Sequence, residues 1–148
     1  METSAVLLEK PERLSLEMVG LKDPSQDEVV VRVLQSGIST GTEKLLWSGA
    51  MPPFPGLGYP LVPGYEAVGE ILECPKGASL KVGDLVFVPG SNGFVDAKGL
   101  FGGSARHLVT SVKRVTKINS QIGEKVSYMP WLPPQDMRSL GLTLNFLI

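Results

Sequence analysis

The chain has 148 residues, of which 43% are hydrophobic, and a formal net charge of −1. This length accommodates one domain with a hydrophobic core and is too short for two domains of ordinary size. The near-neutral charge, with basic residues scattered along the chain, argues against binding to nucleic acid or to an anionic membrane. We find neither a signal-peptide pattern nor 18 consecutive apolar residues, so we expect a cytoplasmic protein without an integral membrane segment.

The predicted secondary structure is mostly short strands. Apolar or alternating runs bounded by turn residues predict strands at 5–8, 14–18, 29–34, 65–72, 85–88, 104–110 and 114–118. Because 17 glycines and 12 prolines leave little room for long helices, only residues 42–47 are expected to form a short helix. Many short strands separated by Gly/Pro turns predict a mainly β domain, as a barrel or a sandwich.

Two further features concern single residues. The one cysteine, Cys74, has no internal disulfide partner, and we expect a buried or half-buried thiol without a reactive role. His107, in a predicted strand, is interpreted as a histidine at a solvent-exposed sheet edge; the alternative is a proton relay or a ligand to a tetrapyrrole magnesium.

Three motifs carry a family resemblance: Gly37-Ile38-Ser39, the run from Pro60 to Ile71 and Gly83-Asp84. This pattern resembles the catalytic domain of the medium-chain alcohol dehydrogenases and implies a GroES-like, partly open β-barrel with short helices. At the positions that match the zinc ligands of that family, this chain has Ser39 and Tyr65. Neither side chain is a good zinc ligand at neutral pH, so the resemblance implies a zinc-free branch and no metal site.

Longer runs narrow the resemblance to one branch. The segments 36–47, 51–56, 59–69, 86–90 and 100–103 resemble the bacteriochlorophyllide a dehydrogenases of bacteriochlorophyll synthesis. That family is understood to oxidise the 3-(1-hydroxyethyl) side chain of a chlorin or bacteriochlorin to acetyl and to pass the hydride to NAD. The resemblance therefore implies a tetrapyrrole substrate, with homo-oligomers as an expectation for complete relatives only.

The same resemblance supplies candidate catalytic residues. Ser39, Thr40 and Tyr65 match positions around the missing metal, and we expect them to form hydrogen bonds with the substrate oxygen, with Glu66 as a neighbouring orienting or relay carboxylate. The alternative is that the Tyr65 ring only fills the vacated metal cavity and that Glu66 supports a turn.

A stiff, almost uncharged loop at 47–60 is the candidate substrate wall. A flat apolar macrocycle needs a broad apolar pocket, and Trp47, Met51, Phe54 and Tyr59 are the candidates to form one side of it. The alternative is that Trp47 and Phe54 belong to the domain core and that the prolines only stiffen a connection.

The resemblance ends near residue 125. We assign 1–125 to the catalytic domain and 126–148 to a tail that the family lacks, either out-of-frame read-through after a one-base deletion near codon 125 or a genuine divergent tail. No Gly-rich turn joins a predicted strand to a helix, so we expect no Rossmann domain in this chain. Its cofactor-binding residues are accordingly unknown.

We therefore expect this chain alone to bind NAD weakly and to be inactive. Two alternatives remain for its function. One is a zinc-free quinone or enoyl reductase lineage, and the other is a non-catalytic β-barrel that binds a partner or a pigment.

Overall fold

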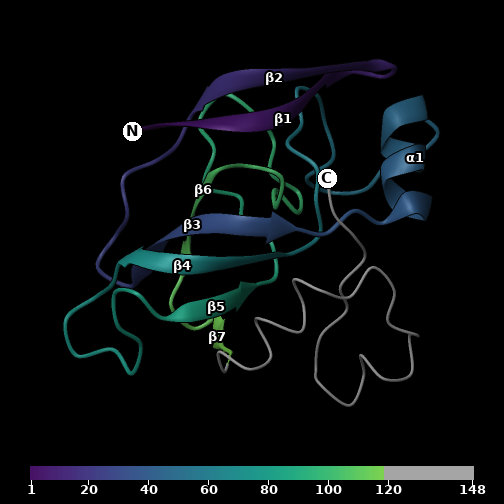
Figure 1. The fold of residues 1–148 in the computed structure, drawn as a ribbon. Helices are drawn as coiled ribbons and strands as arrows, with labels where there is room; N and C mark the ends of the chain where they lie inside the picture. The colour runs from purple at the N-terminus through teal and green to yellow at the C-terminus, as the bar shows by residue number, and fades with distance from the viewer. Residues whose placement is uncertain (119–148) are drawn as a thin grey trace, which may run out of the picture.

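The computed structural model describes residues 1–118, and Figure 1 shows their arrangement. The elements in chain order are β1 (Glu2–Lys10), β2 (Arg13–Gly20), β3 (Glu28–Ser36), α1 (Thr40–Ser48), β4 (Ala67–Glu73), β5 (Leu85–Val88), β6 (His107–Ser111) and β7 (Thr116–Lys117). β1 and β2 form a hairpin, and the other strands form one sheet in the order β6-β3-β4-β5-β7. All neighbouring strands are antiparallel.

The hairpin closes over the larger sheet without completing a barrel. Single bridges connect Ala5 of β1 to Ala105, and Leu8 to Leu61. The two outer strands of the sheet, β6 and β7, do not pair with each other. This partly open, mainly β architecture confirms the predicted fold class.

The main core lies under β3, where Val29, Val30 and Val31 are all buried. Consecutive buried residues are expected in a strand that is covered on both faces. Register shifts between β3 and β4 at Val30/Val31 and at Val33/Gln35 mark irregularities of the kind that curve a sheet around its core.

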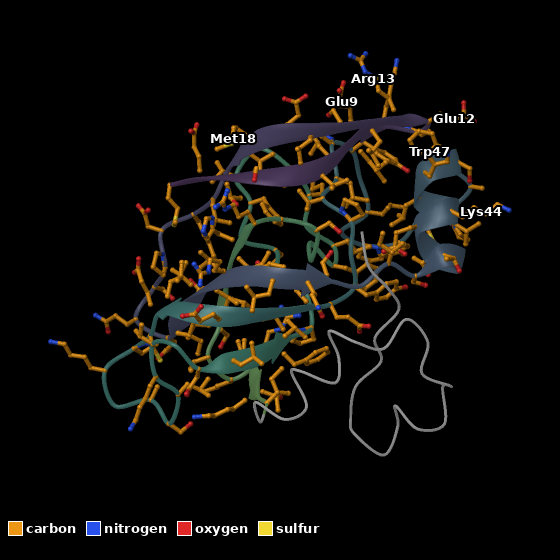
Figure 2. The ribbon with its side chains drawn as sticks, in the orientation of Figure 1. Glu9, Glu12, Arg13, Met18, Lys44 and Trp47 are labelled. Carbon is orange, nitrogen blue, oxygen red and sulfur yellow. The ribbon has the colours of Figure 1, made fainter. Side chains whose placement is uncertain are left out.

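The strand predicted at 14–18 forms, but its apolar face points outward. Leu14, Leu16 and Met18 are 55%, 73% and 62% exposed, whereas Val19 is buried. Figure 2 shows Met18 on the outer side of β2. The alternation gave the secondary structure correctly, yet the hairpin buries its other face, through Thr3, Ala5 and Val19.

The helix α1 is longer than predicted and begins at Thr40. Ser39 precedes it in an extended conformation, and Gly49 ends it with φ +70°, which a glycine adopts at little cost. Leu46 is fully buried with Leu8 and Leu61 in a second, smaller apolar cluster. This cluster holds α1 against the hairpin.

Other predicted boundaries shift for reasons of backbone pairing. Residues 65 and 66 precede β4, and β6 begins at His107 because Ser104 donates its N–H to the Pro63 carbonyl instead of joining the ladder.

The Cys74 thiol is half-buried, as predicted, and donates to the Leu80 carbonyl at 3.3 Å. Within residues 1–118 no helix is long and apolar enough to cross a bilayer. The tail predicted at 126–148 lies outside the described residues.

Candidate functional site

A tight turn at Gly64 places Tyr65. Gly64 has φ +95°, and a Cβ built on it would lie 2.7 Å from the backbone nitrogen of Ser104. The Gly103 N–H donates to the Gly64 carbonyl at 2.8 Å, and the Ser104 N–H donates to the Pro63 carbonyl at 2.9 Å. Because the two backbones touch here, only glycine fits, and the turn fixes the direction in which Tyr65 leaves the chain.

The Tyr65 side chain joins three segments. Its ring stacks on Phe101, with centroids 3.9 Å apart and planes inclined by 28°. Its hydroxyl donates to the Thr42 Oγ1 atom at 2.9 Å. The first turn of α1, the turn at Gly64 and the loop around Phe101 therefore meet at this half-buried tyrosine.

Ser39 and Thr40 lie at the start of the same helix. Ser39 is half-buried, and its carbonyl accepts the Glu43 N–H at 2.9 Å, but its side chain makes no capping hydrogen bond. Thr40 is exposed. Within residues 1–118 the Ser39 hydroxyl therefore caps no helix N–H group, and it lies beside the first turn of the helix, whose free N–H groups attract negative charge.

Glu66 is buried, with 8% of its surface exposed. Its carbonyl accepts the Gly37 N–H at 2.8 Å. This bond holds the segment 37–39 next to the segment 64–66. The two motifs that carried the resemblance, far apart in the sequence, are therefore neighbours.

Glu43 is a member of this site that sequence reasoning missed. Both of its carboxyl oxygens are buried and have no hydrogen-bond partner within residues 1–118. Burial raises the pKa of the Glu43 carboxyl, while the nearby backbone N–H groups of Glu43, Ser39 and Gly64 act in the opposite direction. A carboxyl of this kind is a better proton acceptor near neutral pH than an exposed one.

Sequence reasoning also missed Thr42 and Phe101 as partners of Tyr65. Both belong to motifs that carry the resemblance, yet nothing in the local sequence pairs either of them with Tyr65. One signal was available: Thr42 follows Ser39 by three residues, and this spacing brings side chains together on one face at the start of a helix.

The candidate wall residues fall into two groups. Met51 and Tyr59 pack against the smaller apolar cluster, and the Tyr59 hydroxyl donates to the Leu46 carbonyl. Trp47 and Phe54 are 39% and 37% exposed, so the alternative that placed these two in the core is wrong.

Trp47 also lies away from Tyr65. It follows Thr42 by five residues on α1, which turns it by about 140° around the helix axis. Figure 2 shows Trp47 where α1 meets the hairpin tip, and there the Glu12 N–H donates to the Trp47 carbonyl at 2.7 Å. Trp47 therefore does not share a face with the Tyr65 hydroxyl.

His107 lies on the edge strand β6, opposite Arg32 of β3. Its Nδ1 atom is 3.4 Å from the Thr3 hydroxyl oxygen, which also accepts the His107 backbone N–H at 2.9 Å. Burial lowers the pKa of His107, and Arg106 and Arg32 lower it further. The place on an outer strand agrees with the first interpretation, but His107 is half-buried against β1 and not at a solvent-exposed edge. Within residues 1–118, no group of three or more His, Cys, Asp or Glu side chains gathers as metal ligands would.

Fold and motifs together define a class of protein. Residues 25–120 match the family of the alcohol dehydrogenase GroES-like domain, and the chain belongs to that family. The site at Tyr65 accordingly lies in an alcohol dehydrogenase GroES-like domain.

Two curated relatives, which carry the same name, are similar to this chain over most of its length. The 2-desacetyl-2-hydroxyethyl bacteriochlorophyllide A dehydrogenase of Rhodobacter capsulatus is 49% identical over 124 residues, which cover 83% of this chain and 40% of the relative. The protein of the same name from Cereibacter sphaeroides is 51% identical over 124 residues, covering 80% of this chain and 39% of the relative. The chain therefore spans about 40% of the length of these relatives.

A solved structure of an alcohol dehydrogenase also matches this chain. An alcohol dehydrogenase from E. coli CFT073, crystallised with NADH, superposes with a TM-score of 0.62 at 28% identity. The match covers 80% of this chain and 39% of that structure.

Proposed function

We propose that this chain is the catalytic domain of an oxidoreductase of bacteriochlorophyll synthesis. The reaction is the oxidation of the 3-(1-hydroxyethyl) group of a bacteriochlorophyllide to acetyl. The observation that carries the proposal is the identity of 49% and 51% with two bacteriochlorophyllide dehydrogenases over 124 residues that include the whole Tyr65 site. Because these residues are about 40% of each relative, we expect activity only when the rest of the protein is present.

The oxidation removes a hydride from the substrate carbon and a proton from its oxygen. NAD, when bound, accepts the hydride. Within residues 1–118 every strand pair is antiparallel and the one helix is not part of a βαβ unit, so these residues do not fit a dinucleotide pyrophosphate. We assign NAD binding to the part of the complete protein that lies outside them.

Thr42 is the proposed contact to the substrate oxygen. Its Oγ1 atom accepts the Tyr65 proton at 2.9 Å, which leaves its own O–H and a second lone pair for another partner. As the substrate oxygen gains alkoxide character, the Thr42 O–H donates to it, and the bond from Tyr65 strengthens that donation. Tyr65 thus acts through Thr42 and is a positioning residue.

The proton acceptor is proposed to be a carboxylate. Glu66 was the candidate from the sequence, and it remains a proposed orienting or relay group together with Ser39 and Thr40. Glu43 lies next to Thr42 in the chain and has buried oxygens without partners within the described residues. It is the stronger candidate to receive the proton.

The proposed substrate wall uses the loop 47–60. Phe54 is partly exposed and can meet a flat apolar ring. Met51 and Tyr59 support this loop from the smaller apolar cluster. Trp47 remains a proposed contact only for a macrocycle large enough to reach the far end of α1.

The test is a chimera in which residues 1–118 replace the matching segment of the Rhodobacter capsulatus relative. Turnover of the hydroxyethyl pigment with NAD is expected. The substitution Tyr65→Phe keeps the stack on Phe101 and removes only the hydroxyl, so kcat is expected to fall about 10- to 100-fold with little change in KM.

The matched control is Ser48→Ala, which also removes one hydroxyl, but from the far end of α1, where it donates to the Leu45 carbonyl at 3.3 Å. Its turnover should stay at the parent level. Unchanged kcat in Tyr65→Phe would remove the proposed role of Tyr65, and turnover of a quinone but not of the pigment would favour the reductase lineage.

A further inference from the structure

A cavity of about 380 Å³ lies next to the Tyr65 site. Leu100 lines this cavity, and the following residue, Phe101, stacks on Tyr65. Gly56, from the loop proposed as the substrate wall, lines the cavity beside Leu100, since a Cβ built on Gly56 would lie 3.3 Å from Leu100 Cδ1. The cavity therefore borders both the proposed catalytic residues and the proposed wall.

The charged groups that line this cavity are both cationic. They are Lys98 and Arg114, and no carboxylate is among the lining residues. The nearest acidic residue along the chain, Asp96, is held elsewhere, because its Oδ2 atom accepts the Gly20 N–H at 3.2 Å. Both cations are exposed to solvent, and no carboxylate among the lining residues neutralises them.

Lys98 is held in place by its backbone. Its N–H donates to the Pro60 carbonyl at 2.7 Å, and its carbonyl accepts the Val62 N–H at 2.8 Å. The aliphatic part of its side chain runs over Gly58, where a Cβ would meet Lys98 Cγ at 3.5 Å. The ammonium group at its end has no partner within residues 1–118 and is free to bind an anion.

Arg114 approaches from the segment before β7. One guanidinium N–H group donates to the Pro89 carbonyl at 2.9 Å, which orients the side chain. A guanidinium carries five N–H donors in a planar fork, so the others remain available. This geometry suits a carboxylate better than it suits an isolated hydroxyl.

The remaining wall is partly apolar. Phe94, Ala97 and Leu100 line it, while the polar Ser91 is already satisfied by bonds to Val109 and Gly93. A ligand that fits this lining has an apolar body and one terminal anionic group.

We infer that this cavity binds the free carboxylate of the tetrapyrrole substrate through Lys98 and Arg114. The inference rests on the proposed function. A chlorophyllide is the pigment without its esterifying alcohol, so it carries one free propionate, whereas the esterified pigment has none. Binding of this carboxylate beside the Tyr65 site would orient the macrocycle and would select the unesterified pigment.

The test measures binding of chlorophyllide a and of its methyl ester to the 148-residue chain, by quenching of tryptophan fluorescence. The free acid is expected to bind about tenfold more tightly than the ester, as one well-placed charge pair provides. This preference should disappear in the double variant Lys98→Met/Arg114→Met and persist in Arg114→Lys. Lys113→Met is the control, because Lys113 is exposed beside Arg114 but does not line the cavity. Circular dichroism establishes that each variant is folded.

Each further outcome would overturn the inference in a recognisable way. Equal binding of acid and ester would overturn the carboxylate site and leave the proposed function intact. Binding of neither form would overturn the carboxylate site, while the proposed function would still be decided by turnover of the chimera. Displacement of the acid by ADP-ribose, with a loss of ADP-ribose affinity in the double variant, would assign the cavity to a cofactor phosphate instead.

Discussion

The turn at Gly64 provides a quantitative test of how the site is built. In Gly64→Ala the new Cβ would lie 2.5 Å from the Ser104 Oγ atom and 2.7 Å from its backbone nitrogen. The hydroxyl can rotate away, but the backbone nitrogen is fixed because it donates to the Pro63 carbonyl. Overpacking of this kind costs about 1 to 3 kcal/mol. The positive φ of a non-glycine residue adds about 1 kcal/mol or more.

Two other glycines separate these effects. Gly77 has φ +83°, and no atom lies within 4 Å of the point that a Cβ would occupy, so Gly77→Ala should cost only the conformational part, about 1 kcal/mol. Gly41 lies in the first turn of α1, also with nothing within 4 Å, and Gly41→Ala should stabilise the chain by about 0.5 kcal/mol.

The assay is urea unfolding of the three variants, followed by circular dichroism. We expect Gly64→Ala to lose about 3 kcal/mol, Gly77→Ala about 1 kcal/mol, and Gly41→Ala to gain slightly. A Gly64→Ala protein as stable as Gly77→Ala would show that Ser104 does not press on the turn. The account of how Tyr65 is positioned would then be refuted.

Two predictions concern α1. Leu46→Ala should lower the free energy of unfolding by about 3 kcal/mol because Leu46 is fully buried. Leu45 is 40% exposed, so Leu45→Ala should lower it by less than about 1 kcal/mol. Equal urea midpoints for the two variants would contradict this packing. The raised pKa of Glu43 means that its contribution to stability is fully present below the unfolded-state pKa and is lost as pH rises through the folded-state pKa. Glu43→Gln should therefore gain stability relative to the parent as pH rises from about 4 to about 8, measured as urea midpoints, and a difference that does not change with pH would exclude an effect of ionisation.

The sequence alone determined the class of fold and the family. Strands at 29–34 and 85–88 could be predicted because apolar runs and turn residues act within a few positions of each other. The family motifs Gly37-Ile38-Ser39 and Gly64-Tyr65-Glu66 could be recognised for the same reason: each is a continuous run. Tyr65 was therefore a candidate before any contact of its side chain was known.

Only the tertiary structure decided what Tyr65 touches. Thr42 precedes it by 23 residues, and Phe101 lies on a loop between β5 and β6. Such partners depend on strand order and on where each loop closes, which local periodicity does not encode. The same holds for β2, whose alternation gave a strand but not the outward direction of Leu16. Which face of a strand is buried is set by what packs on it, and that information lies in the rest of the chain.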